Sequence, residues 1–257
     1  MPKSYVVLVS LLSSAFALSQ PATGVPVAPP SSRTVLPITF TKTVSADHSH
    51  AGDTVLAKTT QVVRLATGEV VPAGTEVVGH VAAANAFLYD NTPYAKQREA
   101  VLDIQFDALH LAGHDMPLSV TVRAMADPLT SRGARMPKPS DLDSYSAVSQ
   151  IGGDELVPSQ SEVVDRNGDV VAYNRRSGVY AHLIANGSCD ASSNEVSVDI
   201  YSASACGLYG FTEVTARETG SASSPSRLSL ISTHTSPKIW RYSTALLEVL
   251  PSTGAAR

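Results

Sequence analysis

The densest group of side chains that could bind a metal lies between residues 47 and 53: Asp47, His48, His50 and Asp53. Two imidazoles and two carboxylates in one loop are suitable ligands for Zn²⁺. The same residues are also typical of a solvated turn, because aspartate side chains accept hydrogen bonds from nearby backbone N–H groups. Since no more distant ligand can be identified, we favour the turn. A divalent metal is the alternative, and no other cofactor is expected.

The two cysteines, Cys189 and Cys206, are the next candidates for chemistry. In an oxidising compartment two cysteines are expected to form a disulfide. A nucleophilic thiol or a metal-bound thiolate is the alternative, but neither has a Cys-x-x-Cys spacing or a neighbouring histidine to support it. We therefore expect a structural disulfide, which in the chain-entropy model stabilises a fold by about 3 kcal/mol.

Aromatic side chains gather in the second half of the chain. They are candidates to line a groove for a glycan or a peptide. The alternative is that they fill one end of the fold beneath an irregular segment. The residues are Tyr173, Tyr180, Tyr201, Tyr209, Trp240 and Tyr242.

Catalytic motifs do not accompany these candidates. The sequence has no Gly-x-Ser-x-Gly elbow, no phosphate-binding loop and no dinucleotide fingerprint. Asp103 and Asp107 lie four residues apart on one expected strand, about 13 Å from each other, too far for the paired carboxylates of a glycosidase. The sequence therefore favours a non-enzymatic protein without excluding an enzyme.

The first 19 residues have the features of a signal peptide. Lys3 gives a positive start, Tyr5 to Leu12 is an apolar run, and Ala15-Phe16-Ala17 is a small-residue cleavage site. The run is well short of the roughly 20 residues that span a bilayer, so we expect no transmembrane helix after signal removal. Residues 20–34 are rich in proline and predict a linker. These features predict an exported protein that is periplasmic, envelope-associated or extracellular.

The overall composition is that of a globular domain. The chain has 257 residues, of which 43% are hydrophobic, and a formal net charge of −4. That length is sufficient for a sizeable core. The charge provides no basic field to attract nucleic acid, so we exclude nucleic acid as a partner.

Residues 35–250 are expected to fold as one all-β domain. Alternating apolar and polar residues at 38–44, 102–108 and 245–249 have the period of a half-buried strand. Gly79 in the middle of a valine-rich strand predicts a bulge or a close backbone approach. Many short strands and no convincing amphipathic helix favour an antiparallel β-barrel or closed sandwich. Closure would pair the last strand with the first.

Two local expectations follow from the segments around residue 100. Residues 82–97 are polar and are expected to form a loop. The strands at 102–108 and 118–124 are joined by a turn at 112–115, so we expect them to form a long antiparallel hairpin.

The character of the sequence changes between about residues 127 and 178. Prolines, the pair Gly152-Gly153 and many Ser and Asp residues interrupt any period. A structureless loop of this length is uncommon inside a compact domain. We therefore expect an insertion with short elements of its own. Residues 251–257 are expected to be a tail.

The segment 35–124 has a distinctive order of motifs. A strand and a Gly-Asp turn are followed by "GEVVPAGTEVVGHV" and then by "LDIQFDALHLAGHDMPLSV". This order resembles the C-terminal β-barrel domain of the channel protein that lines the outer-membrane core complex of conjugation and type IV secretion systems. That family shows a similar "G..viPaGt.v.G.v" and a similar alternating hairpin. The final strand, residues 243–250, resembles the closing strand of such barrels.

The sequence also departs from that family. Its members have an inner-membrane helix, a long proline-rich stalk and a helical hairpin that forms the outer-membrane pore. Here a cleavable signal replaces the helix, the proline segment is brief, and the hairpin is not visible. The resemblance therefore implies the barrel and a scaffold role, but not secretion.

Together these features predict an exported envelope protein that acts through protein–protein contact, with other envelope proteins or with a second copy of itself. The alternative is a secreted glycan-binding module or a hydrolase of envelope glycan. That alternative needs a groove in residues 127–242 in which carboxylates and aromatic rings converge.

Overall fold

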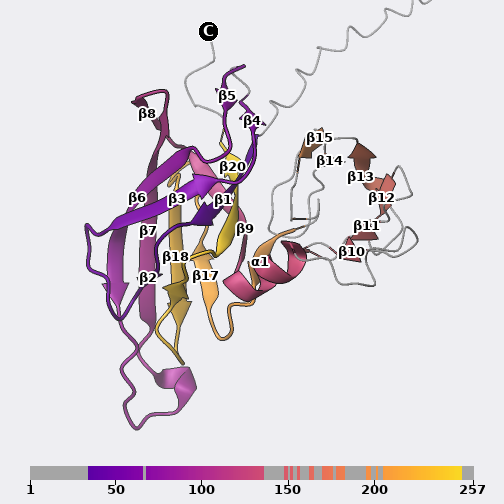
Figure 1. Cartoon of the computed structure of the whole chain (residues 1–257). Helices are drawn as coiled ribbons and strands as arrows, with labels where there is room; N and C mark the ends of the chain where they lie inside the picture. The colour runs from indigo at the N-terminus through magenta and orange to yellow at the C-terminus, as the bar shows by residue number, and fades with distance from the viewer. Residues whose placement is uncertain are drawn as a thin grey trace, which may run out of the picture. The chain divides into compact units, whose positions relative to one another are not determined.

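We describe the fold from a computed structural model (Figure 1). The described residues are 34–65, 68–135 and 205–250, with the short segments 148–149, 151–152, 155–156, 162–164, 170–175, 178–182, 195–197 and 201. All of them belong to one compact unit that spans residues 31–257. Most of the described residues form strands, which confirms the all-β prediction.

The largest sheet has ten strands in the order β16-β9-β20-β1-β3-β6-β7-β18-β17, with β8 paired to β7. Two small sheets, β2–β19 and β4–β5, complete this part of the fold. The strands are β1 (Val35–Phe40), β2 (Val44–Ser45), β3 (Thr54–Thr59), β4 (Val63–Arg64), β5 (Val70–Val71), β6 (Glu76–Asn85), β7 (Ala100–Leu111), β8 (His114–Pro117), β9 (Val120–Ala126), β16 (Gly207–Tyr209), β17 (Thr215–Glu218), β18 (Arg227–Ser232), β19 (Lys238–Ile239) and β20 (Thr244–Val249).

The large sheet curls round and nearly closes into a barrel. The first strand pairs with the last, with Val35 opposite Glu248, as the sequence predicted. At the other edge of β9, the backbone N–H of Val122 donates to the carbonyl oxygen of Thr219 at 2.6 Å, and Ser226 N–H donates to Val120 at 2.7 Å. These bonds join the β17–β18 connection to β9. Most of the backbone N–H and C=O groups that an open sheet would leave unpaired at its edges are therefore hydrogen-bonded here.

Side chains fill the inside of this barrel. The main buried cluster draws on almost every strand of the wall, and the rings of Phe40 and Phe106 lie 6.3 Å apart within it. Leu102, Ile104 and Phe106 point inward from β7, as their alternation predicts. The barrel interior is thus a hydrophobic core.

The alternation of β7 shifts at Asp107. Val78 of β6 pairs with Ala108, but the next residue, Gly79, pairs with Phe106, so Asp107 is the extra residue of a β-bulge. Beyond the bulge Leu109 is buried instead of Ala108. The sequence pattern placed Ala108 on the inward face because an uninterrupted period of two cannot reveal the inserted residue.

Gly79 lies opposite this bulge, where the two backbones approach closely. A Cβ atom built on Gly79 would lie 2.2 Å from the carbonyl oxygen of Gln105 and 3.2 Å from Cα of Phe106. Real Cβ atoms do not approach backbone atoms that closely. The sequence predicted a bulge or a close backbone approach at Gly79, and the structure has both.

Two local expectations were wrong. The segment 118–124 does not return beside β7, because β9 crosses to pair with β20 and only the short β8 completes the hairpin. Residues 82–85 continue β6 and are not loop. Asp103 lies on the polar face of β7, as the alternation predicts, but it is buried there and forms an ion pair with Arg227 at 2.8 Å.

The segment after β9 begins with a helix that the sequence pattern did not reveal. α1 (Pro128–Arg135) starts with proline at its first position, and the Asp127 side chain accepts a hydrogen bond from Thr130 N–H at 2.7 Å. Both are helix-start features. The 3₁₀ helix η1 (Tyr94–Lys96) lies in the β6–β7 connection. None of the helices among the described residues is long and apolar enough to cross a membrane.

A second sheet lies within the predicted insertion and continues past it. Its six strands pair in chain order, β10 to β15. β13 and β14 lie on either side of the predicted boundary at 178 and pair directly with each other. The strands are β10 (Val148–Ser149), β11 (Glu155–Leu156), β12 (Glu162–Val164), β13 (Val170–Arg175), β14 (Gly178–His182) and β15 (Glu195–Ser197).

Part of the outer face of the barrel wall is also buried. Val35, Ala124 and Leu246 form a second apolar cluster with Ile151 and Tyr201, which belong to the segment between β9 and β16. The inserted segment therefore covers the wall where β1, β20 and β9 lie side by side.

A buried polar contact attaches this segment to the wall. The hydroxyl of Thr244 on β20 lies 2.7 Å from the Tyr201 hydroxyl and 2.9 Å from the Ser131 hydroxyl of α1. All three residues are almost fully buried. Hydrogen bonds of this kind satisfy polar groups that would otherwise destabilise the interface.

Tyr201 is expected to make stability depend on pH in the alkaline range. Burial raises the pKa of Tyr201 above its ordinary value of 10.0, so the unfolded chain ionises this phenol at a lower pH than the folded chain. Its contribution to stability is complete below pH 10 and decreases above it, by at most about 1.4 kcal/mol per pH unit. Thermal melts between pH 8 and pH 11 should show a steeper loss for the wild type than for Tyr201→Phe. Parallel losses would contradict this expectation.

Candidate functional site

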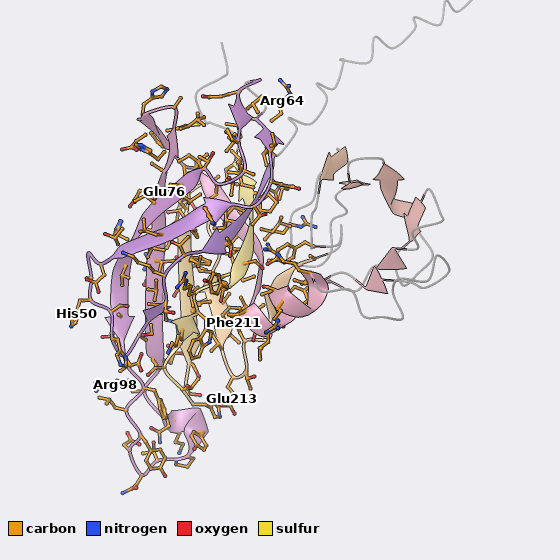
Figure 2. All side chains as sticks on the ribbon, in the orientation of Figure 1. His50, Arg64, Glu76, Arg98, Phe211 and Glu213 are labelled. Atoms are coloured by element: carbon orange, nitrogen blue, oxygen red, sulfur yellow. The ribbon has the colours of Figure 1, made fainter. Side chains whose placement is uncertain are left out.

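Three connections meet at one end of the barrel, which we call the loop end. The connections are residues 41–53, 86–99 and 233–243. The strand ends that they join are neighbours in the sheet, because Thr54 pairs with His80, Asn85 with Val101, and Ser232 with Ala100. Figure 2 labels Arg98 and Glu213 at the loop end, and Arg64 towards the opposite end.

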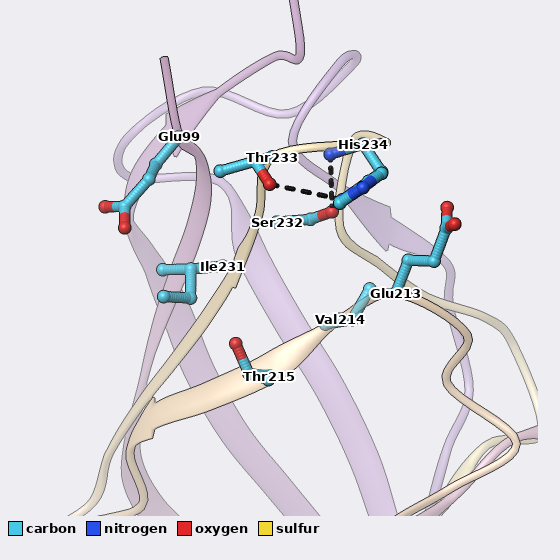
Figure 3. A pocket seen from close by; sticks show the side chains of 8 residues that line it. All are labelled: Glu99, Glu213, Val214, Thr215, Ile231, Ser232, Thr233 and His234. Atoms are coloured by element: carbon cyan, nitrogen blue, oxygen red, sulfur yellow. Dashed lines mark hydrogen bonds between the residues drawn. The ribbon is translucent and has the colours of Figure 1, made fainter. Parts of the chain in front are cut away.

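A shallow pocket of about 510 Å³ lies at the loop end (Figure 3). Its walls come from the residue before β7, the segment that enters β17, and the end of β18 with its following turn. They supply two carboxylates, one imidazole, three hydroxyls and two aliphatic side chains. The lining residues are Glu99, Glu213, Val214, Thr215, Ile231, Ser232, Thr233 and His234.

Hydrogen bonds and ring contacts hold the polar wall of the pocket. The Thr233 hydroxyl lies 3.1 Å from Nδ1 of His234, whose backbone N–H donates to the Ser232 hydroxyl at 3.0 Å. The His234 ring also stacks on Tyr94, with centroids 4.6 Å apart. A hydroxyl beside an imidazole is one part of an activated nucleophile, but activation also needs a group that orients the imidazole. The Tyr94 ring lies against the face of the imidazole and does not supply such a group.

Glu99 contributes little free negative charge to the pocket, because it forms an ion pair with Arg217 of β17. Glu213 is the second carboxylate, and its backbone has a φ of 59° in the left-handed region. The glycan-binding alternative needs a groove in residues 127–242 in which carboxylates and aromatic rings converge. Glu213 is the one carboxylate from that region in the lining of this pocket, and the nearby ring, Tyr94, comes from outside the region.

Next to the pocket, residues 86–98 form a projecting connection that we call the aromatic loop. It contains η1 and is the lowest part of the barrel domain in Figure 1. Leu88, Tyr89 and Tyr94 are 72%, 64% and 51% exposed. Exposure of large apolar side chains to solvent is unfavourable, and a group of them is typical of a contact surface.

The aromatic loop is held in shape by Gln97, which is buried. Its side-chain oxygen accepts a hydrogen bond from Asp90 N–H at 3.1 Å, and its amide nitrogen donates to the carbonyls of Asp90 and Thr92 at 2.9 and 2.8 Å. The Thr92 hydroxyl and N–H both donate to the Asp90 carboxylate, which lowers the pKa of Asp90. The loop therefore has an internal polar framework beneath its exposed apolar side chains.

The predicted metal ligands lie in two exposed pairs in the 41–53 connection. Asp47 Oδ1 lies 2.9 Å from Nδ1 of His48, and Asp53 accepts a hydrogen bond from His50 N–H at 2.8 Å. The Ser45 hydroxyl, and then His48, lower the pKa of Asp47. In the part of the chain that the structure describes, no three His, Cys, Asp or Glu side chains form a group suited to a metal ion. Zinc binding by these four residues stays the alternative to the turn that the sequence favours.

The predicted aromatic residues occupy different places. Trp240 and Tyr242 are exposed at the loop end, where Lys238 Nζ lies 3.7 Å from the Trp240 ring and Arg241 lies 4.5 Å from the Tyr242 ring. The remaining four lie on other elements: Tyr209 is on β16, Tyr201 is buried against Thr244, and Tyr173 and Tyr180 are partners in the β13–β14 ladder.

The predicted disulfide involves one described residue. Cys206 lies just before β16, and its backbone N–H donates to the Tyr209 hydroxyl at 3.0 Å. Cys189 lies outside the described residues, so the Cys189–Cys206 bond stays a prediction.

The aromatic loop and the pocket residues were not singled out by their sequence. One signal was available, since Phe87-Leu88-Tyr89 places three large apolar residues in an otherwise polar segment. The pocket had no comparable signal, because Glu99, Glu213 and His234 come from three separate connections.

Comparison of the chain with models of protein families, with curated proteins and with solved structures yielded no match.

Proposed function

We propose that this protein is an exported scaffold of the cell envelope whose β-barrel domain acts by contact with other proteins. The filled interior of the barrel is the observation that carries the proposal. The main core cluster includes inward side chains from β1, β3, β6, β7, β9, β18 and β20. A barrel packed with side chains has no lumen for a ligand or a channel. Its activity therefore depends on its outer surface.

Two further features support this role. The N-terminal 19 residues have the charge and apolar run of a signal peptide, and the motifs at 35–124 resemble the barrel domain of an envelope channel complex. In such a complex the barrel would serve as a structural part. The covered face at β1, β20 and β9 is already occupied by the chain's own segment, which leaves the other faces and the two ends for partners.

Photo-crosslinking in the native envelope tests the proposal. A photoreactive amino acid at Val62 or Glu76, both exposed near the end opposite the loop end, is expected to give adducts of higher mass after irradiation. The same amino acid at Leu230, which is fully buried, is the matched control and should give none. Irradiated samples with only the free monomer at every exposed position would contradict a contact-based function.

A further inference from the structure

The exposed large apolar side chains of the described residues are concentrated at the loop end. Strand register places six of the eight there: Leu88, Tyr89, Tyr94, Leu129, Trp240 and Tyr242. Leu129 belongs to this end because α1 follows Ala126, the partner of Thr244. The remaining two, Val62 and Val70, belong to the β4–β5 hairpin at the other end. Such segregation indicates a surface that contacts something apolar.

Basic side chains lie among these apolar residues. Lys96 and Arg98 belong to the aromatic loop, and Lys238 and Arg241 lie over the Trp240 and Tyr242 rings. The aromatic loop and residues 238–242 together contain four basic residues and one acidic residue. Elsewhere at the loop end Lys42 is outnumbered by carboxylates, those of Asp47, Asp53, Glu99 and Glu213. The positive charge is therefore local to the aromatic loop and residues 238–242, where the exposed rings also lie.

These residue types match the chemistry of a lipid–water interface. Tyrosine and tryptophan place an apolar ring in the acyl boundary and a polar group at the headgroups, while lysine and arginine reach lipid phosphates. Leucine at the end of a projecting loop can enter the apolar layer. The hydrogen bonds of Gln97 also satisfy backbone groups inside the aromatic loop, and unsatisfied backbone groups are what oppose entry of a loop into lipid.

The shape of the loop end also distinguishes lipid from a protein partner. Its apolar side chains lie on separate connections, and the aromatic loop projects from the barrel (Figure 1). The concave part of this end is lined mainly by carboxylates, hydroxyls and an imidazole (Figure 3). Separate apolar projections with basic neighbours suit a fluid surface of anionic headgroups.

We infer that the loop end docks on the surface of a bilayer that contains anionic phospholipid, with Leu88 and Tyr89 of the aromatic loop entering the headgroup region. Lys96, Arg98, Lys238 and Arg241 contact the lipid phosphates. This contact is separate from the proposed protein–protein contacts and does not depend on them.

Sedimentation of the full chain with vesicles tests this inference. Vesicles of phosphatidylethanolamine and phosphatidylglycerol are compared with vesicles of phosphatidylcholine. The wild type is expected to bind the anionic vesicles, and Leu88→Ser with Tyr89→Ser is expected to bind at least tenfold more weakly. The matched control, Val62→Ser with Val70→Ser, removes two exposed apolar side chains from the opposite end and should stay within twofold of the wild type. Both double variants keep the N-terminal apolar run, so any vesicle binding by that run is the same in the two and cancels when they are compared.

Tryptophan fluorescence tests the orientation separately. The chain has one tryptophan, so Trp240→Phe provides a background for a reporter at Leu88 or at Val62. Brominated lipid should quench the Leu88→Trp variant and leave the Val62→Trp variant unquenched.

Four outcomes would overturn the inference: absence of vesicle binding, equal loss in the two serine pairs, equal quenching of the two reporters, or self-association that requires Leu88 and Tyr89. The last would assign the loop end to a second copy of the chain.

Discussion

Replacing Gly79 with alanine is expected to lower the melting temperature by roughly 6 to 12 °C, equivalent to about 3 kcal/mol of unfolding free energy. The new Cβ would lie 2.2 Å from the carbonyl oxygen of Gln105. Relief of that overlap requires β6 and β7 to separate, because the obstructing atom belongs to the backbone and cannot rotate away. Thermal unfolding followed by circular dichroism measures the effect.

Gly133→Ala is the matched control for this substitution. Gly133 lies in α1, and no side chain or other element packs within 4 Å of the position its Cβ would take. Alanine favours a helix over glycine by about 1 kcal/mol, so this variant should be as stable as the wild type or slightly more stable. Equal melting temperatures for Gly79→Ala and the wild type would show that β6 and β7 are not packed as closely as described.

Removal of the Glu248 carboxylate is expected to destabilise the fold by about 3 to 5 kcal/mol. Glu248 on β20 and Arg123 on β9 have side chains only 1% exposed, and Oε2 of Glu248 lies 4.0 Å from the Arg123 guanidinium. Glu248→Leu leaves the charge of Arg123 inside the protein without this carboxylate. Chemical denaturation of the variant and the wild type gives the difference in unfolding free energy.

Two controls separate burial from charge. Glu99→Leu removes one partner of the Glu99–Arg217 pair, whose side chains are about half exposed, and should cost less than about 1 kcal/mol. Arg123→Met combined with Glu248→Leu removes both buried charges and should recover most of the lost stability. If the double variant is as unstable as Glu248→Leu alone, the loss of unfolding free energy comes from the changed shape of the side chains and not from the unpaired charge.

The sequence predicted the features of the fold that depend on local pattern. Alternation marked the strands at 102–108 and 245–249, and the match between the first and last strands followed from the need to close the sheet. Gly79 was informative because glycine weakens the interior of a strand and is typical there of a bulge or a close backbone approach. For the strands and for Gly79, the physical cause lies within a few residues of the pattern.

The rest depended on contacts between distant residues. The bulge at Asp107 moved burial from Ala108 to Leu109, and one strand's sequence cannot reveal which residue its neighbour leaves unpaired. Asp103 followed the polar pattern, yet it is buried because Arg227 from β18 supplies a partner. The pocket at the loop end combines residues from three connections, so only the folded chain brings them together.

The position of β20 between β1 and β9 has a consequence for the order in which the chain folds. Until residues 244–249 have been synthesised, β1 and β9 both present an open edge. Pairings between residues as far apart as Val35 and Glu248 form slowly, because the entropy of closing the loop is lost before the contacts stabilise it. The barrel can therefore close only once β20 is available to pair with both of these strands.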